Sequence, residues 1–401
     1  MSADARTLEA RYGARNYAPL PVVLVRASGA EVWDADGRAY IDMLGAYSAV
    51  SHGHCHPRLV AALTDQAGRM DVISRAFVSD RLGGFLERAC RMTGMDRALP
   101  MNTGAEAVET ALKAARKWAY TVKGVAENAA EIIVCDGNFH GRTIAISGFS
   151  SVAQYRSGFG PFPPGFRRVP FGDAAALEAA ITPNTAAFLV EPIQGEGGVV
   201  VPPDGYLARC AEICRARNVL LICDEIQTGL GRTGRLLACQ HDGVQPDGLL
   251  LGKALGGGLV PVSLFLARDD VMAVFTPGDH GSTFGGYPLA AAVGDEALKV
   301  LEEEKLVERS ARLGAYMLDR LRGLNHPAIV EVRGRGLFAG IEFDPAEFQA
   351  GDVCHALLRE GILTKDTLRN TVRFAPPLTI ETRQIDRAVA ALAHVVAAVP
   401  A

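Results

Sequence analysis

The stretch 219–258 decides the fold: it begins VLLICDEIQTGLGRTG and ends LLLGKALGGG. Two apolar runs in it, Val219–Cys223 and Leu249–Leu251, are bounded by turn residues and are too short for helices, so they predict buried strands. Asp224 follows the first run directly, and Lys253 follows the second after one glycine. Because ligands bind at the carboxyl ends of strands in an open α/β sheet, we expect this carboxylate and this amine to border one crevice.

Lys253 differs from the other lysines of the chain. The sequence has seven, and most of the others lie in helix-like patterns where a solvated amine is expected. Burial disfavours the charged form of an amine, and a lysine near neutrality is a nucleophile toward carbonyl groups. The alternative is a lysine whose flexible stem carries the charge out to solvent from a strand end.

Composition limits the class of protein. The chain has 401 residues, 49% hydrophobic and 21% charged, which is ordinary for a globular protein of two or three domains. The net charge is −4 and the pI about 6.2, which argues against a nucleic-acid or anionic-membrane partner.

The cysteines and the N-terminus predict a cytoplasmic protein. The eight cysteines include no CxxC pair, so a reducing compartment fits better than a disulfide framework. The first residues, MSADARTLEARYGARNY, lack the apolar segment of a secretory signal. No apolar run approaches the ~18 residues that would span a bilayer.

The order of elements predicts an α/β fold. Residues 1–50 read as an arm with a small antiparallel meander and part of a small domain, and 51–290 as a large cofactor-binding domain. In the large domain, apolar strands alternate with helices, which is typical of a mainly parallel sheet flanked by helices. A long helix, 288–304, begins the third part, 291–401. We expect that part and the N-terminal residues to form a smaller α+β domain built from both chain ends.

Three histidines, His52, His54 and His56, lie within five residues. Alternating histidines can bind a metal, but no further set with ligand spacing follows them. We therefore expect a turn that leads into a helix from Pro57, and no metal site.

The chain offers a candidate for each contact that pyridoxal phosphate requires. The phosphate needs a helix N-terminus, the ring a flat and a branched neighbour, the pyridine nitrogen an acid, the ring oxygen a donor, and the aldehyde a lysine for a Schiff base. Each candidate alone could be a core or turn residue, and their joint order carries the prediction. The candidates are Gly104 and Ala105 after Thr103 for the phosphate, Phe139 and Ile226 for the ring, Asp224 for the pyridine nitrogen, Gln227 for the ring oxygen and Lys253 for the aldehyde.

Two arginines indicate the substrate. Arg142 lies in the loop after Phe139, and Arg373 stands between apolar residues, where an unpaired charge is costly. Arginine binds carboxylates through two parallel hydrogen bonds, so the pair suggests a dicarboxylate. Glu196, in a glycine-rich loop, could bring an acid beside Arg373.

Two glycine-containing stretches do not complete a nucleotide-binding motif. Gly231-Arg232-Thr233-Gly234 lacks the Gly-Lys-Ser/Thr of a P-loop, and Gly334-Arg335-Gly336 has no strand–helix context for a dinucleotide. The rival from another class, a noncatalytic nucleotide-binding α/β protein, would have to use these glycine loops.

The motifs Glu191-Pro192-Ile193-Gln194-Gly195-Glu196, Asp224-Glu225-Ile226-Gln227 and Gly252-Lys253-Ala254 resemble those of the class III aminotransferases of fold type I. The resemblance covers nearly the whole chain. It implies a pyridoxal phosphate enzyme with Lys253 as the Schiff-base lysine and Asp224 at the pyridine nitrogen. It also implies a homodimer with shared active sites, in which Thr283 reaches the phosphate of the neighbouring subunit.

Within this family, Asn16–Leu24, Ala46–Val50 and Arg373–Leu378 resemble the branch that transfers the δ-amino group of L-ornithine to 2-oxoglutarate. That resemblance implies that Tyr17 contacts the substrate α-amine, Tyr47 shapes the pocket and Arg142 holds the α-carboxylate. Glu196 would pair with Arg373 in the first half-reaction and release it for 2-oxoglutarate in the second. N-acetylornithine or 4-aminobutyrate is the alternative substrate. His52 and Tyr287 depart from the pattern, which has glutamine and asparagine there.

Overall fold

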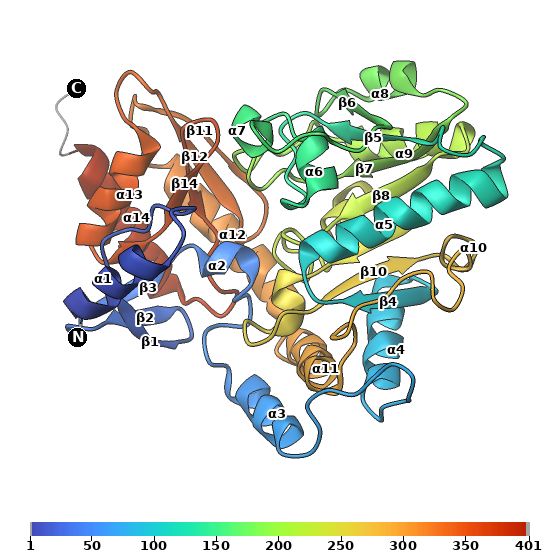
Figure 1. The fold of residues 1–401 in the computed structure, drawn as a ribbon. Helices are drawn as coiled ribbons and strands as arrows, with labels where there is room; N and C mark the ends of the chain where they lie inside the picture. The colour runs from blue at the N-terminus through green and yellow to red at the C-terminus, as the bar shows by residue number, and fades with distance from the viewer. Residues whose placement is uncertain (1, 398–401) are drawn as a thin grey trace.

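A computed structural model describes residues 2–397 of the chain. Within that range the strands form one sheet of seven strands and two sheets of four. Figure 1 shows the large sheet on one side of the molecule and the two smaller sheets, which hold the first and last parts of the chain, on the other.

The central sheet is parallel over five of its seven strands, and one strand is antiparallel to both its neighbours. This confirms the predicted α/β class with a mainly parallel sheet. The inner strands β7, β8 and β9 are buried along their whole length and are mostly apolar, because helices cover both faces. In sheet order the strands are β4 (Arg97–Met101), β10 (Ser263–Ala267), β9 (Gly248–Leu251), β8 (Leu220–Asp224), β7 (Thr185–Val190), β5 (Glu131–Cys135) and β6 (Phe166–Val169).

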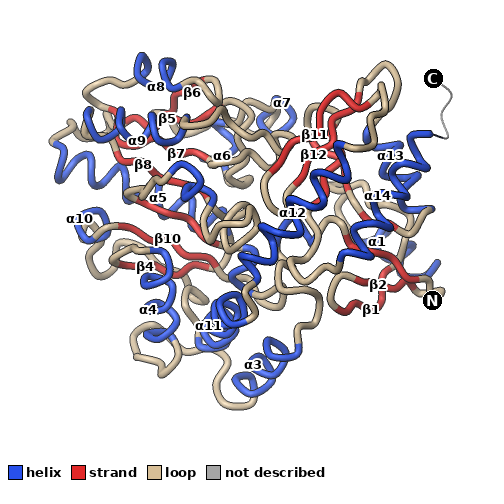
Figure 2. Tube along the Cα trace, turned by 180° about the vertical axis from the view of Figure 1, so that it is seen from behind, coloured by secondary structure: helices blue, strands red, loops and turns tan. Residues whose placement is uncertain are grey.

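Alternate residues of these strands face two different hydrophobic clusters. On one face, Ile132, Leu189 and Ile222 pack with α5 (Gly104–Trp118). On the other face, Ile133 and Leu221 belong to the cluster that includes α9 (Tyr206–Ala216), α11 (Pro288–Glu303) and α12 (Leu306–Arg322). Seen from behind, α12 lies between the large sheet and the smaller ones (Figure 2).

Both ends of the chain meet in the first small sheet. Its strands are β1 (Leu24–Ser28), β2 (Glu31–Asp34) and β3 (Ala39–Asp42), which form the predicted meander, and β13 (Ile362–Leu363), which pairs in parallel with β3. The second small sheet has the order β11 (Ile329–Gly334), β12 (Ala339–Phe343), β15 (Thr371–Phe374) and β14 (Lys365–Thr367), all antiparallel.

The remaining helices connect and cover these sheets. The predicted helix 105–121 begins at Gly104, and its last turn widens to a π-helical turn at Ala119–Lys123. Single turns of 3₁₀ helix occupy Ala238–Asp242 and Lys253–Gly256. The other helices are α1 (Ser2–Tyr12), α2 (Gly45–Ser48), α3 (Pro57–Ala67), α4 (Leu82–Thr93), α6 (Ile144–Phe149), α7 (Ala153–Arg156), α8 (Ala174–Ala180), α10 (Asp269–Met272), α13 (Ala350–Arg359) and α14 (Thr382–Ala397).

The three alternating histidines have separate partners. His52 is buried and its Nε2 lies 2.9 Å from the Ala297 carbonyl oxygen, while His54 pairs with Asp42 and His56 with Glu304. Across residues 2–397, no group of three His, Cys, Asp or Glu side chains is placed to hold a metal ion. In the same range no helix combines the length and the apolar character needed to cross a bilayer.

Candidate active site

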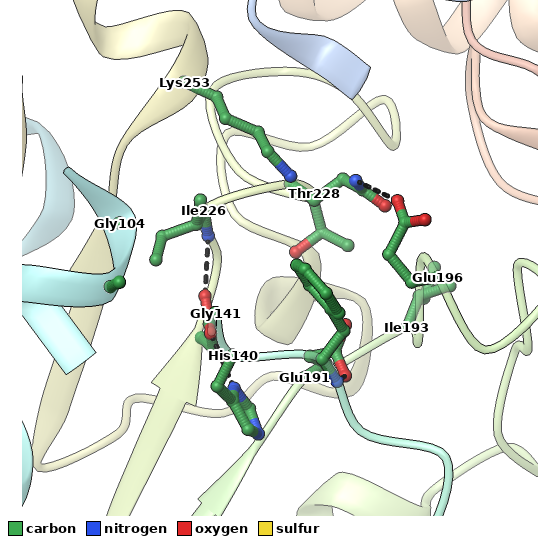
Figure 3. Close-up of a pocket in the computed structure, with 13 residues that line it drawn as sticks. Gly104, His140, Gly141, Glu191, Ile193, Glu196, Ile226, Thr228 and Lys253 are labelled. Carbon is green, nitrogen blue, oxygen red and sulfur yellow. Dashed lines mark hydrogen bonds and ion pairs between the residues drawn. The ribbon is translucent and has the colours of Figure 1, made fainter. Parts of the chain in front are cut away.

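A cavity of about 200 Å³ opens at the carboxyl ends of β5, β7, β8 and β9. This is the sheet edge where α/β proteins bind ligands, and it is where the sequence placed Asp224 and Lys253. Figure 3 shows Lys253 and Glu196 pointing toward the same space from different segments. The lining residues are Gly104, Ala105, Phe139, His140, Gly141, Glu191, Ile193, Glu196, Asp224, Ile226, Gln227, Thr228 and Lys253.

Lys253 enters the cavity from a strained backbone. It follows β9 after Gly252 and has φ +45°, in the left-handed region that non-glycine residues rarely occupy. Such strain persists at sites where the surroundings fix a side chain for function. Burial lowers the pKa of Lys253 from 10.5 to about 8, although the nearby carboxylate of Glu196 opposes the shift. The side chain is therefore readily available as a neutral amine.

Asp224 ends β8 and is held from two sides. One carboxylate oxygen accepts a hydrogen bond from the amide of Ile226 at 3.0 Å, and the other lies 2.7 Å from Nδ1 of His140. Both side chains are buried. Burial lowers the pKa of His140, but the hydrogen bond to Asp224 and the charges of Asp224 and Glu191 together outweigh burial, and the pKa is raised.

The helix α5 begins at the cavity wall. Thr103 caps it: its hydroxyl accepts from the Glu106 amide at 3.2 Å, and the Glu106 carboxylate accepts from the Thr103 amide at 2.7 Å. A Cβ on Gly104 would lie 3.0 Å from Cδ1 of Ile226, so glycine lets the helix start approach that side chain closely. Phe139 and Ile226 both line the cavity and leave room for a flat ring.

Glu191 is a functional candidate that the sequence did not single out. It is buried, and its two carboxylate oxygens accept from the amides of Phe139 at 3.0 Å and Gly195 at 3.3 Å. Burial raises the pKa of Glu191 to about 7. The residue links the loop of Phe139 to the loop of Glu196. His140 was missed for the same reason: a lone His or Glu in a loop has no periodic signal, and only the adjacent Phe139 pointed to this segment.

The predicted pair of Glu196 and Arg373 is present. Arg373 is fully buried on β15, and its Nη1 lies 2.6 Å from Oε1 of Glu196. Burial would raise the pKa of Glu196, but Arg373 outweighs burial and the pKa is lowered. Gln227 donates to the same oxygen at 3.3 Å. Within residues 2–397, Nε and Nη2 of Arg373 find no acceptor, so the guanidinium has donors free for another carboxylate.

Tyr47 covers Arg373. Its ring centroid is 5.0 Å from the guanidinium carbon, a cation–π contact. The backbone at Ala46, Tyr47 and Ser48 has φ of 45°, 60° and 76°, three non-glycine residues in the left-handed region. A strained turn therefore orients this side chain over the arginine.

Arg142 lies at the outer part of the site. Its guanidinium carbon is 4.3 Å from the ring centroid of Tyr155 and 5.7 Å from that of Phe139. The charge is exposed beside the ring that lines the cavity, as a carboxylate-binding group would be.

Five of the predicted residues are not among those that line the cavity: Tyr47, Arg142 and Arg373, described above, and Tyr17 and Thr283. Tyr17 is 76% exposed on the segment before β1, and Thr283 is exposed in the loop that precedes α11. Of the two departures from the family pattern, His52 is buried against Ala297, and Tyr287 begins α11 with its ring edge-on to Phe284.

The residues present fit pyridoxal phosphate. A capped helix start can hold a phosphate, Phe139 and Ile226 can hold a ring, and a buried acid and a lysine of lowered pKa border the same space. Within the described part of the chain, Oε1 of Gln227, a residue that lines the cavity, is buried without a partner.

The fold and this site define an aminotransferase, and the chain belongs to the class-III aminotransferase family, which matches residues 12–396. Among its relatives, the ornithine aminotransferase of Bacillus subtilis is 56% identical over 384 residues, 96% of this chain and 95% of that one. The ornithine aminotransferase structure of Toxoplasma gondii, which contains PLP at partial occupancy in its active site, has a TM-score of 0.98 and 50% identity over 100% of this chain and 95% of that one. An acetylornithine aminotransferase structure from Elizabethkingia anophelis has a TM-score of 0.89 and 46% identity over 99% of both chains.

Proposed function

We propose that this protein is a pyridoxal-phosphate-dependent ornithine aminotransferase, which converts L-ornithine and 2-oxoglutarate to L-glutamate 5-semialdehyde and L-glutamate. The observation that carries the proposal is the buried Arg373, paired with Glu196 and with two donors left over, close to Lys253. An arginine that can be covered or uncovered suits an enzyme that must accept two substrates of different charge in turn. The relatives' activity agrees with this assignment.

Pyridoxal phosphate, when bound, supplies an aldehyde for the amine and a ring that takes up the electron pair released at the carbon bearing nitrogen. Gly104 and Ala105 would hold its phosphate, Phe139 and Ile226 its ring faces, and Gln227 its ring oxygen. Asp224, supported by His140, keeps a proton on the pyridine nitrogen.

With pyridoxal phosphate bound, Lys253 would be both its attachment point and the group that moves the proton. Its amine, with a pKa of about 8, would take the proton from the δ-carbon of ornithine and release it again within the site. Arg142 holds the α-carboxylate of ornithine and Tyr17 its α-amine, while Tyr47 shapes the pocket. These contacts leave the δ-amine facing Lys253.

Glu196 and Arg373 separate the two half-reactions. While ornithine is bound, Glu196 neutralises Arg373. When 2-oxoglutarate enters, Glu196 turns away and Nε and Nη2 of Arg373 bind the α-carboxylate of that substrate through two hydrogen bonds. Arg142 then holds the distal carboxylate.

The protein works as a homodimer with shared active sites. Thr283 lies outside the cavity of its own chain, and apolar side chains near it are exposed, including Phe77 at 66%, Val78 at 98% and Phe284 at 48%. A second copy that covers this face would bring Thr283 to the phosphate of its neighbour. The free cysteines fit a reducing, cytoplasmic setting. The proposed ornithine activity would belong to arginine and proline metabolism.

A paired assay tests the proposal. L-ornithine and N-acetyl-L-ornithine are each offered with 2-oxoglutarate, and both glutamate and the cyclised semialdehyde are measured. We expect a strong preference for free ornithine. A preference for the acetylated substrate would leave the family and the proposed role of Lys253 unchanged. The protein would then be an acetylornithine aminotransferase, like the Elizabethkingia anophelis relative. Failure of both, with no chromophore after addition of pyridoxal phosphate, would favour a noncatalytic protein.

A further inference from the structure

Glu196 sits on a tight hairpin, residues 194–200, closed by reciprocal backbone hydrogen bonds between Gln194 and Val200 at 3.1 and 2.9 Å. Its turn is strained: Gly198 has φ +111° and the fully buried Val199 has φ +52°. A β-branched residue rarely adopts this conformation, so contacts from outside the hairpin must stabilise it.

Arg333 on β11 provides the main contact. Its side chain is 7% exposed, and it donates from Nη2 to the Gly198 carbonyl at 2.6 Å and from Nε to the carbonyls of Gly198 and Val199 at 3.0 and 3.2 Å. On its other side, Nη1 pairs with Glu331 and Glu342. The guanidinium is thus charge-balanced, oriented, and bonded to the two strained residues.

Two other strands of the same small sheet, β14 and β12, also contact the hairpin. Thr367 on β14 donates its hydroxyl to the carbonyl of Glu196 at 2.7 Å. On β12, Gly340 lies opposite Arg373 in the register, and a Cβ there would be 3.0 Å from Cβ of Val199. The sheet that carries Arg373 therefore also fixes the backbone of the residue that covers Arg373.

We propose that Arg333 is a positioning residue that decides which amino group of the substrate reacts. It holds the hairpin so that Glu196 reaches Arg373 and can leave it only by rotation of its side chain. The inference rests on the proposed ornithine activity. If the hairpin loosens, Arg373 is left uncovered while ornithine is bound and takes the ornithine α-carboxylate. The α-amine then faces Lys253 in place of the δ-amine.

The two outcomes differ in which nitrogen is transferred. In the δ reaction, nitrogen leaves Cδ for glutamate and the product is glutamate 5-semialdehyde. In the α reaction, nitrogen leaves Cα for glutamate and the product is 5-amino-2-oxopentanoate. Both consume one 2-oxoglutarate and form one glutamate, so the amount of glutamate cannot separate them, whereas the origin of its nitrogen can.

The test uses ornithine labelled with ¹⁵N at the δ position only. The holoenzyme turns it over with 2-oxoglutarate, and mass spectrometry measures labelled and unlabelled glutamate. We expect the unlabelled fraction to rise about tenfold in Arg333→Met, which loses the charge-assisted bonds to both carbonyls. Thr367→Val, nearly isosteric, should raise it less. Arg335→Met is the matched control, because Arg335 pairs with the fully exposed Asp204 and not with the hairpin, and it should leave the fraction unchanged.

Hydrogen exchange supplies a readout apart from activity: peptides covering 194–200 should exchange faster in Arg333→Met and not in Arg335→Met. A folded Arg333→Met with wild-type exchange and wild-type label distribution would overturn the inference. If Arg333→Met does not fold, the same two measurements on Thr367→Val decide: wild-type exchange and wild-type label distribution in that variant would overturn the inference. A wild-type enzyme that gives no labelled glutamate would instead contradict the proposed ornithine activity.

Discussion

At the scale of single residues, two features of Lys253 act together. The left-handed backbone aims the side chain into the cavity, and burial lowers its pKa to about 8. Lys365 is the contrast within the same chain: burial would lower its pKa, but Asp366 outweighs burial and raises it above 10.5.

We therefore expect Lys253 to react first in competitive labelling of the cofactor-free protein. A lysine with a lowered pKa loses its proton, and becomes nucleophilic, at lower pH. Trace acylation at a series of pH values, read by peptide mass spectrometry, should give a midpoint near pH 8 for Lys253 and above 10.5 for Lys365. Equal midpoints would show that burial does not tune Lys253.

Tyr17 offers a test of substrate choice. A hydroxyl that contacts the α-amine of ornithine has no such partner in 4-aminobutyrate. Tyr17→Phe should lower kcat/KM for ornithine about fivefold, which corresponds to about 1 kcal/mol of transition-state stabilisation. The loss of kcat/KM for 4-aminobutyrate should be smaller. Tyr12→Phe, similarly exposed on the same arm, is the control and should change neither. Equal losses on both substrates in Tyr17→Phe would count against the contact.

At the scale of elements, the start of α5 should affect both the stability of the protein and its affinity for the cofactor. The capping box of Thr103 and Glu106 fixes the helix end beside the cavity. Thr103→Ala should cost about 1 kcal/mol of stability. It should also weaken pyridoxal phosphate binding about fivefold, measured by titration of the cofactor-free protein.

Asp173→Ala is the matched control for that prediction. Asp173 caps α8, away from the cavity, by accepting from the Ala176 amide at 2.9 Å. Its loss should destabilise the protein by a similar amount and leave cofactor affinity unchanged. A Thr103→Ala protein with wild-type affinity would mean that the cap serves the helix alone.

The elements that could be predicted from the sequence are those whose burial is uniform. β7, β8 and β9 are buried throughout and almost entirely apolar, so their pattern is independent of distant contacts. β4 and β6 were not predicted, since Pro100 and the pair Arg167 and Arg168 interrupt the apolar pattern. Both are edge strands, where a proline or a charge is tolerated.

The same distinction holds for the site. Lys253 and Asp224 follow buried strands, and their order along the chain with Gly104, Phe139 and Gln227 carried the prediction. The roles of His140 and Arg333 were not predicted, because their partners Asp224 and Gly198 come from other segments, and only the folded chain brings them together.

At the scale of the whole molecule, Arg232 connects the parts of the chain that must move as one unit around the site. It follows β8 and is fully buried. Its Nη1 donates to the carbonyls of Leu337 and Pro376 at 2.8 and 2.5 Å, and its Nη2 donates to the Ser51 hydroxyl at 2.9 Å. These acceptors flank the strands of the small sheet and the turn after Tyr47, so one guanidinium fixes both to the loop that follows Asp224.

Arg232→Met should therefore lower stability by about 3 kcal/mol, because the methionine fills much of the space but leaves buried acceptors without a donor. For a chain of this length that loss corresponds to a fall of about 4 °C in Tm, measured by calorimetry on the holoenzyme. Arg235→Met, three residues later at the surface, should stay within about 1 °C. If Arg232 only fills space, its variant will match that control. If it joins the large and small sheets, the variant should also raise KM for 2-oxoglutarate, since Arg373 would no longer be held at a fixed distance from Lys253.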